Sequence, residues 1–301
     1  MKSFFRYIWK HKTAYLMVAP LIIGVLVFCY YPAISGIFLA FTDKTAVLGQ
    51  QEQFVGFRNF VDLFKDPIFL NSFGTMLLIQ IPRLIAGIVV PLIYAEIIFA
   101  LRNKRSQAVY RILILLPIVA PGVVSTLVWK QIYQVDGLMN AILSALSPSY
   151  VPIDWLSNPD WVIFAILYMG FPWIGGASVL IYLSGLMNIP KGYLEAADLD
   201  GASAIQKIFK IHIPQIAGQI RYFLVFGLIS GLQDYGTQVV LTNGGPGYAT
   251  YVPGYYMYEL MNTHGEYGKA AAIGVILFAI IMVLTFVTFK FARFGGDKED
   301  A

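Results

Sequence analysis

The fold is decided by residues 190–214, which read PKGYLEAADLDGASAIQKIFKIHIP. Pro190 can open a helix, because the first helical turn does not need the N–H group that proline lacks. The pattern predicts a short helix over residues 193–200, which Gly201 ends, and a second helix over residues 202–211. This segment therefore predicts two short helices that meet at a glycine, rather than an ordinary connecting loop.

The chain on both sides of this segment is strongly apolar. Of its 301 residues, 58% are hydrophobic and 13% are charged, and the mean hydropathy is +0.68. Soluble domains have about 45–50% apolar and about 25% charged residues. The composition excludes a disordered chain, a nucleic-acid-binding domain and an ordinary soluble enzyme. It predicts a protein that crosses a membrane several times.

Six apolar runs are long enough to cross a lipid bilayer, which takes about 20 residues of helix. These predicted spans are residues 15–41, 72–99, 112–133, 161–187, 220–241 and 271–291. The segment that opens at Pro190 lies between the fourth and the fifth, and Pro214 is expected to bend the chain before the fifth. We expect an all-α membrane protein in which residues 1–301 form a single transmembrane domain.

Lysine and arginine indicate which side of the membrane each loop faces, because they are retained in the cytoplasm. Six spans place both termini and the loop after the fourth span on one side. Of the 21 Lys and Arg residues, fifteen lie on that side and four on the other. Both termini are therefore predicted to be cytoplasmic. The predicted cytoplasmic parts include residues 1–13, about 188–219 and the tail 292–301.

The segment at 190–214 has two interpretations. Its first helix is small on part of its surface, where Ala196, Ala197, Gly201 and Ala202 would let another surface approach closely. One interpretation is an amphipathic helix that lies on the lipid surface. The other is a docking site for a cytoplasmic partner. The residue types alone leave both open.

The spacing of this segment resembles the EAA loop of permease subunits in binding-protein-dependent ABC importers. Seven residues carry the resemblance: Glu195, Ala196, Ala197, Gly201, Ile211, Ile213 and Pro214. The family commonly has leucine where this chain has Ile213. The resemblance extends over roughly residues 14–291, and it implies the type I permease fold of ABC importers with six transmembrane helices.

Other stretches narrow the resemblance to the maltose-type carbohydrate permeases. Residues 54–60 (FVGFRNF) and 182–190 (YLSGLMNIP) are similar to segments of that subfamily. The short N-terminus and the six spans are more similar to the glycerol-phosphate and oligosaccharide permeases than to the longer maltose subunit. A further match is the subfamily's outer-loop signature, at Gly244, Gly245 and Pro246.

The resemblance implies a transport subunit with several partners in the cell membrane of a bacterium or archaeon. Importers of this kind contain two permease subunits, two ATPases and an external solute-binding protein. We expect the second permease subunit to be related but different, and the cargo to be a carbohydrate, expected to be an oligosaccharide. ATP and Mg²⁺ would be used by the ATPases. The implied ATPase-coupling residues are Glu195, Ala196, Ala197, Asp198, Gly201, Ile211 and Pro214.

Polar side chains within a span are costly, so they mark candidate substrate pathways. Arg83 faces a cavity, pairs across a subunit interface, or forms a structural pair with a carboxylate or with free carbonyls. The residues at 233–235, predicted in the middle of the fifth span, offer polar groups for sugar hydroxyls and a ring for the apolar face of a sugar. Ordinary helix packing is the alternative for residues 233–235 and for the aromatic residues of the fourth span. The full set is Arg83, Tyr168, Trp173, Gln233, Asp234 and Tyr235.

Other chemistry is not indicated by the sequence. There is no G-x-x-x-x-G-K-[ST] run, so the chain itself is not expected to hydrolyse ATP. We expect no catalytic residue, no metal site, no cofactor and no nucleic-acid partner. His212 is expected to be an ordinary polar residue of the cytoplasmic loop, and Glu96 to reach water or Arg102. The alternative function is a self-sufficient secondary transporter or channel.

Overall fold

The computed structural model describes residues 10–47, 49, 51–172 and 174–291. Within these residues the regular elements are helices, and one isolated bridge pairs Thr42 with Phe54. The all-α prediction is therefore confirmed for the described part of the chain. The chain divides into two compact units. The first runs to Asp66 and includes Met257–Ile276, and the second contains Pro67–Tyr256 and the residues from Leu277 onward.

The first unit begins with a long apolar helix, Lys12–Leu39. It consists of α2 (Lys12–Val25), a π-helical stretch η1 (Leu26–Tyr30) and α3 (Tyr31–Leu39). None of the 18 residues in its most apolar window is buried within this unit. A helix that exposes apolar side chains on all sides requires lipid or another protein around it.

A short helix supports the end of α3. Asn59, in α4 (Arg58–Lys65), donates from its side-chain amide to the carbonyl oxygens of Ala40 and Thr42, each at 2.8 Å. These bonds satisfy carbonyls that the end of a helix leaves free. The remaining helices of this unit are the end of α16 (Pro253–Glu259), the π-helical η4 (Leu260–His264) and the start of α17 (Tyr267–Phe291).

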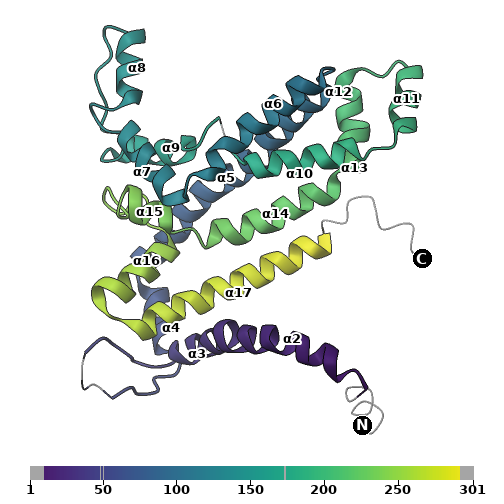
Figure 1. Cartoon of the computed structure of the whole chain (residues 1–301). Coiled ribbons are helices and arrows are strands. Elements are labelled where there is room, and N and C mark those ends of the chain that lie inside the picture. Colours follow the sequence, from purple (N-terminus) through teal and green to yellow (C-terminus); the bar gives the residue numbers. More distant parts are fainter. Residues whose placement is uncertain (1–9, 48, 50, 173, 292–301) are drawn as a thin grey trace. The chain divides into compact units, whose positions relative to one another are not determined.

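The second unit is built around α5 (Pro67–Ala100). Helices α10 (Gly176–Met187) and α14 (Ala217–Leu232) pack against it, and Figure 1 shows the three lying side by side. The second half of α5, which ends at Ala100, packs with α10 in a buried apolar core. Ile216, the residue just before α14, also belongs to this core. This core cluster comprises Ala95, Ile98, Val179, Tyr182, Leu183, Leu186, Ile189 and Ile216.

Three helices are long and apolar enough to cross a membrane: Lys12–Leu39, Pro67–Ala100 and Tyr267–Thr288. They correspond to the first, second and sixth predicted spans. The third predicted span is bent by 90° between α6 (Lys104–Leu115), which continues into η2 (Leu116–Val119), and α7 (Gly122–Ile132). Pro117 and Pro121 lie at this bend, where each removes a backbone donor from the helix.

The fourth predicted span, residues 161–187, is two short helices rather than one. The first, α9 (Pro159–Tyr168), ends before Gly170, and α10 begins after Gly175. These two glycines have φ angles of 91° and 68°, a left-handed conformation that stops a helix. The expectation of a continuous helix is therefore wrong here, because the apolar run contains two residues in left-handed backbone.

The fifth predicted span is interrupted as well. Helix α14 ends at Leu232, and α15 (Gly236–Leu241) begins after a break. At its other end α14 meets the helical stretch Ala204–Gln215 at a bend of 68°. When each of the two bent pairs counts as one span, the described helices provide up to five candidate membrane spans.

A buried asparagine organises the connection between α7 and α9. Asn140, in α8 (Leu138–Leu146), is 2% exposed. Its side-chain oxygen accepts from the Tyr150 hydroxyl at 2.6 Å, the Ile153 N–H at 3.1 Å and the Trp155 indole N–H at 3.0 Å. Its amide nitrogen donates to three backbone carbonyls. This residue therefore satisfies many polar groups that a loop would otherwise leave buried.

Candidate functional site

The segment at 190–214 forms two helices that meet at Gly201. The first is α11 (Lys191–Leu199), and Gly201 follows it with a φ of 70°. The Gly201 N–H donates to the Asp198 carbonyl at 3.1 Å, and the Ala202 N–H donates to the Ala197 carbonyl at 2.9 Å. This pair of bonds is the Schellman motif, which ends helices at a left-handed residue.

The second helix runs further than predicted. Ser203 and Gln206 form a reciprocal capping box at its start, with bonds of 3.3 and 2.8 Å. The expectation that Pro214 bends the chain is wrong, since the bend lies at Ile216. A wider π-helical stretch precedes the proline and accommodates it without ending the helix. The consecutive pieces are α12 (Ala204–Lys207), η3 (Ile208–His212) and α13 (Ile213–Gln215).

An ion pair joins the two helices across the glycine turn. The carboxylate of Asp198 in α11 contacts the ammonium group of Lys207 in α12. With the Schellman motif and the capping box, this contact fixes the angle between the helices. The segment is therefore a defined structure and not a flexible connector.

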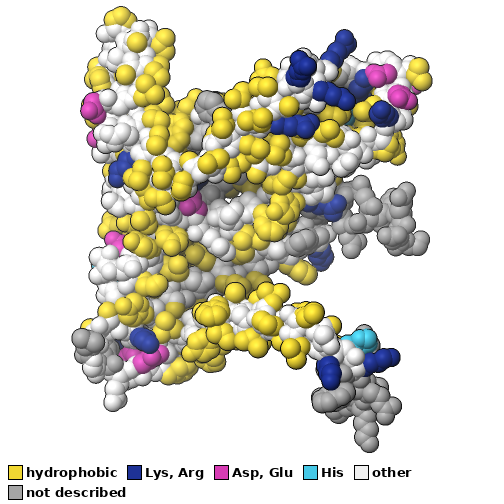
Figure 2. Space-filling view, in the orientation of Figure 1, with side chains coloured by type: hydrophobic (Ala, Val, Ile, Leu, Met, Phe, Trp, Pro, Cys, Tyr) yellow, Lys and Arg dark blue, Asp and Glu magenta, His cyan; other side chains and the backbone are white. Residues whose placement is uncertain are grey.

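Both helices of the segment expose large apolar side chains. Leu199 is 90% exposed, Ile205 68% and Phe209 66%. Figure 2 shows charged side chains gathered at the end of this unit where α6, α11 and α12 lie. Exposed apolar groups beside charged groups are typical of a surface that contacts a partner or lipid. Of the predicted coupling residues, Glu195, Ala196, Asp198, Gly201 and Pro214 are exposed, whereas Ala197 is buried and Ile211 is partly buried against the core cluster.

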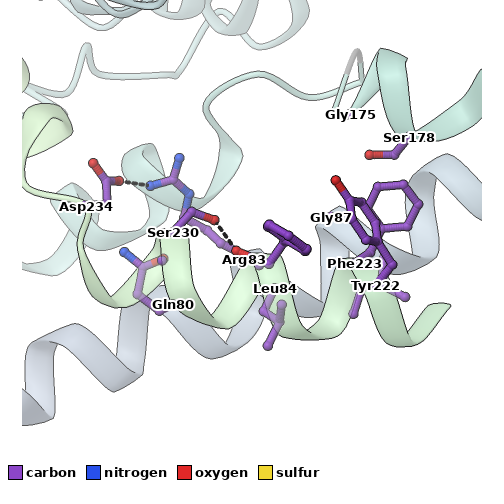
Figure 3. A pocket seen from close by; sticks show the side chains of 14 residues that line it. Gln80, Arg83, Leu84, Gly87, Gly175, Ser178, Tyr222, Phe223, Ser230 and Asp234 are labelled. Atoms are coloured by element: carbon purple, nitrogen blue, oxygen red, sulfur yellow. Dashed lines mark hydrogen bonds and ion pairs between the residues drawn. The ribbon is translucent and has the colours of Figure 1, made fainter. Parts of the chain in front are cut away.

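A cavity of about 610 Å³ is bordered by α5, α10 and α14. Polar side chains of Gln80, Ser178 and Ser230 share its wall with the rings of Tyr222 and Phe223 (Figure 3). The Gln80 amide nitrogen is buried and has no hydrogen-bond partner within the described residues. The cavity thus combines hydrogen-bonding groups with aromatic surface.

Arg83 and Asp234 form an ion pair at the wall of this cavity. The Arg83 Nη1 atom lies 2.9 Å from Asp234 Oδ2, and the side chains are 29% and 25% exposed (Figure 3). Asp234 also accepts a hydrogen bond from the Thr237 hydroxyl at 3.0 Å. Arg83 therefore both pairs with a carboxylate and borders a cavity, which combines two of the predicted alternatives for this residue.

A second cavity, of about 850 Å³, is also lined by this pair. Arg83, Gly175 and Asp234 line both cavities. Gln233 and Tyr235 line only the second one, together with α7 residues such as Trp129. The ion pair therefore belongs to the wall that the two cavities share.

The position of residues 233–235 corrects the sequence prediction. They lie in the break between α14 and α15, and not in the middle of a helix. The Asp234 carboxylate accepts from the N–H of Thr237, in the first turn of α15, at 3.4 Å. Aspartate favours such positions, because its side chain satisfies the free N–H groups at the start of a helix.

The other predicted site residues lie elsewhere. Tyr168 ends α9 and stacks on Phe164 at 5.7 Å between ring centroids; it is not among the residues that line the two cavities. Trp173 lies outside the described residues, as do residues 1–9 of the N-terminal segment and the tail 292–301. Gly244, in the outer-loop signature, has a φ of 76° and faces the rings of Tyr251 and Tyr255.

Sequence reasoning missed one buried pair. His212 was expected to be an ordinary loop residue, and Glu96 to reach water or Arg102. Instead, His212 Nδ1 lies 2.9 Å from Glu96 Oε2, and the two side chains are only 9% and 11% exposed. The cavity residue Gln80 was also missed, although it lies one helical turn from Arg83 on the same face. No cluster of metal-ligating side chains is found in the described part of the chain.

Comparison with known proteins decides the family. The model for the binding-protein-dependent transport system inner membrane component matches residues 87–293. The chain belongs to this family. The predicted binding-protein-dependent permease is therefore confirmed at the level of the family, and the family is one of membrane transport components.

Relatives of this inner membrane component match it over nearly their whole length. The probable ABC transporter permease protein YesP of Bacillus subtilis is 30% identical over 294 residues, which cover 95% of this chain and 92% of that protein. The multiple sugar-binding transport system permease protein MsmF of Streptococcus mutans is 30% identical, with coverage of 92% and 93%. A solved bacterial ABC transporter involved in the import of alginate has a chain 25% identical to this one, with a TM-score of 0.84 and coverage of 97% and 98%.

Proposed function

We propose that this chain is the permease subunit of an ATP-driven, binding-protein-dependent importer of a carbohydrate, most simply an oligosaccharide. The observation that carries the proposal is the pre-shaped helix–glycine–helix segment with an exposed apolar face, in a member of this family. Relatives named for multiple sugars, for trehalose and maltose, and for arabinooligosaccharides support a carbohydrate cargo. The solved alginate importer supports it as well.

In this proposal the chain crosses the membrane six times within a single domain over residues 1–301. Each interrupted run crosses once, with α9 and α10 together forming the fourth crossing. Both termini are cytoplasmic, including residues 1–13 and 292–301, because fifteen of the 21 Lys and Arg residues would then lie inside. The segment around 188–219 faces the cytoplasm.

The cytoplasmic segment couples the permease to an ATPase. Leu199, Ile205 and Phe209 present an apolar surface that an ATPase groove can cover, and Glu195 supplies an exposed charge beside it. A related second permease completes the pathway, and the ATPases use ATP and Mg²⁺. An external solute-binding protein delivers the cargo; one solved relative is a complex with an alginate-bound periplasmic protein, which supports this partner.

The cargo passes the two cavities beside the Arg83–Asp234 pair. Hydrogen-bonding groups such as Gln80 and Ser230 suit sugar hydroxyls, and the rings of Tyr222 and Phe223 suit the apolar face of a sugar ring. Alternating access opens the pathway first to the outside and then to the cytoplasm. ATP-driven movement of the cytoplasmic segments drives this exchange.

Affinity purification in mild detergent from the native membrane tests the proposal, with mass spectrometry of the proteins that co-purify. We expect a P-loop ATPase and a second multi-span subunit. Gly201→Asp and Glu195→Lys should lose the ATPase while the chain still inserts. Gly247→Asp is the matched control, since that glycine lies outside the segment, is exposed and, like Gly201, has a left-handed φ and no atom within 4 Å of an added Cβ. A chain that purifies alone and transports without ATP would establish the secondary transporter instead.

A further inference from the structure

The buried pair of Glu96 and His212 ties the cytoplasmic segment to α5. His212 belongs to η3, in the second helix of that segment, and Glu96 lies near the end of α5. The His212 Nδ1 atom is 2.9 and 3.1 Å from the two carboxylate oxygens, and its ring packs edge-on against Phe99 at 5.4 Å between centroids. A buried carboxylate without a partner is costly, because its charge is then neither hydrated nor paired.

Apolar contacts surround this pair and reinforce it. Ile216, four residues after His212, is fully buried in the same core cluster as Ala95 and Ile98, which flank Glu96 on α5. Leu194 and Ile211, one from each helix of the segment, pack on this cluster from outside. The inner side of the segment is thus fixed to α5, while its outer side stays exposed.

Two stretches of chain are joined by both polar pairs: α5, and the stretch from His212 to Asp234. The Arg83–Asp234 pair joins them at the cavity. Along α5, Glu96 and Arg83 are separated by roughly 20 Å at the rise of an α-helix. Along the other stretch, α14 runs between His212 and Asp234 and packs against α5. Both stretches are therefore connected by a polar pair at each end and by packed side chains between them.

We propose that Glu96 and His212 are positioning residues that transmit movement of the cytoplasmic segment to the cavity. A pull on the segment at 190–214 moves the inner end of α5 through this pair. Because the two stretches are joined at both ends, α5 and α14 move as one body and carry the Arg83–Asp234 wall with them. The inference rests on the proposed function, which supplies the ATPase that moves the segment.

Chemical labelling of a cavity cysteine in the whole importer tests this inference. The chain carries Cys29→Ser and Ser230→Cys, and it is purified with its co-purifying partners and reconstituted in liposomes. Ser230 borders the cavity. The probe is a charged methanethiosulfonate, and the measured quantity is the labelling rate with ATP and vanadate divided by the rate without them. We expect this ratio to change by about fivefold or more in the otherwise unaltered importer.

Variants of the pair should separate ATP hydrolysis from this response. In Glu96→Leu and in His212→Leu, ATP hydrolysis continues, but the labelling ratio is about one because ATP no longer changes the labelling rate. The double variant Glu96→Leu with His212→Leu replaces a buried polar pair by apolar side chains, which usually preserves folding. It should assemble and remain unresponsive, so the test does not depend on the stability of the single variants. The exchange variant Glu96→His with His212→Glu should restore the response.

Tyr150→Phe is the matched control, because it removes a buried hydrogen bond to Asn140 outside this connection and should keep the response. A double apolar variant that responds like the unaltered importer would overturn the inference. An unaltered importer whose ratio stays constant while ATP is hydrolysed would overturn the proposed function itself, which is a distinct result.

Discussion

Replacing Asp234 with asparagine would leave Arg83 at the cavity wall without its carboxylate. The asparagine keeps one oxygen for the Thr237 hydroxyl, so the change removes the charge and the weaker acceptor for the Thr237 N–H. A charge-assisted bond contributes about 1.5–3 kcal/mol to stability. The two side chains are 29% and 25% exposed, so water screens part of that energy. We expect Asp234→Asn to lower the free energy of unfolding by about 2 kcal/mol, and Arg83→Met to lower it by a similar amount.

The double variant decides whether the two residues act as a pair. If they do, Asp234→Asn with Arg83→Met costs less than the sum of the single changes, with a coupling energy of about 1–2 kcal/mol. Thermal unfolding of the purified importer in mild detergent measures this, because 2 kcal/mol corresponds to roughly 3 °C in a chain of this size. Additive shifts would refute the reasoning. Unchanged melting temperatures with abolished uptake would assign both residues to the cargo instead.

Five further substitutions test three local features by thermal unfolding of the purified importer. Gly201→Ala should cost about 1 kcal/mol, since its left-handed φ disfavours a side chain although no atom lies within 4 Å of the new Cβ; Gly201→Asn should cost less, and equal costs would contradict this. Gly244→Ala should cost about 3 kcal/mol, because its Cβ would lie 2.6 Å from the Tyr251 ring; a neutral result would contradict that packing. Asn140→Leu should cost about 3 kcal/mol or more and Tyr150→Phe about 1 kcal/mol; a reversed order would exclude Asn140 as the centre of its network.

Local signals in the sequence predicted local structure well. The helix–glycine–helix arrangement around Gly201 follows from residues within a few positions of each other, since the Schellman motif and the capping box both act within one turn. The three uninterrupted spans follow from apolar length alone. Position 170 is different, because an apolar run gives no sign of which glycine adopts a left-handed backbone.

The cavity wall depends on contacts between distant parts of the chain. Arg83 and Asp234 are 151 positions apart, and Glu96 and His212 are 116 apart. The sequence marks Arg83 and Asp234 as costly within a span, but it does not show which partner each finds. The carboxylate of Asp234, in the break of the fifth span, bonds both Arg83 and Thr237, and the bond to Arg83 depends on the packing of α5 against α14.

The turn at Gly201 has a consequence for how quickly another protein can bind the cytoplasmic segment. The Schellman bonds, the capping box and the Asp198–Lys207 pair already hold the two helices in place within the single chain. A surface that must become ordered on binding loses about 0.5–1.5 kcal/mol of conformational entropy for each long side chain that is immobilised. Backbone ordering adds to that loss in flexible segments. Because this segment is pre-organised, a docking protein meets a finished surface, and association needs no folding step.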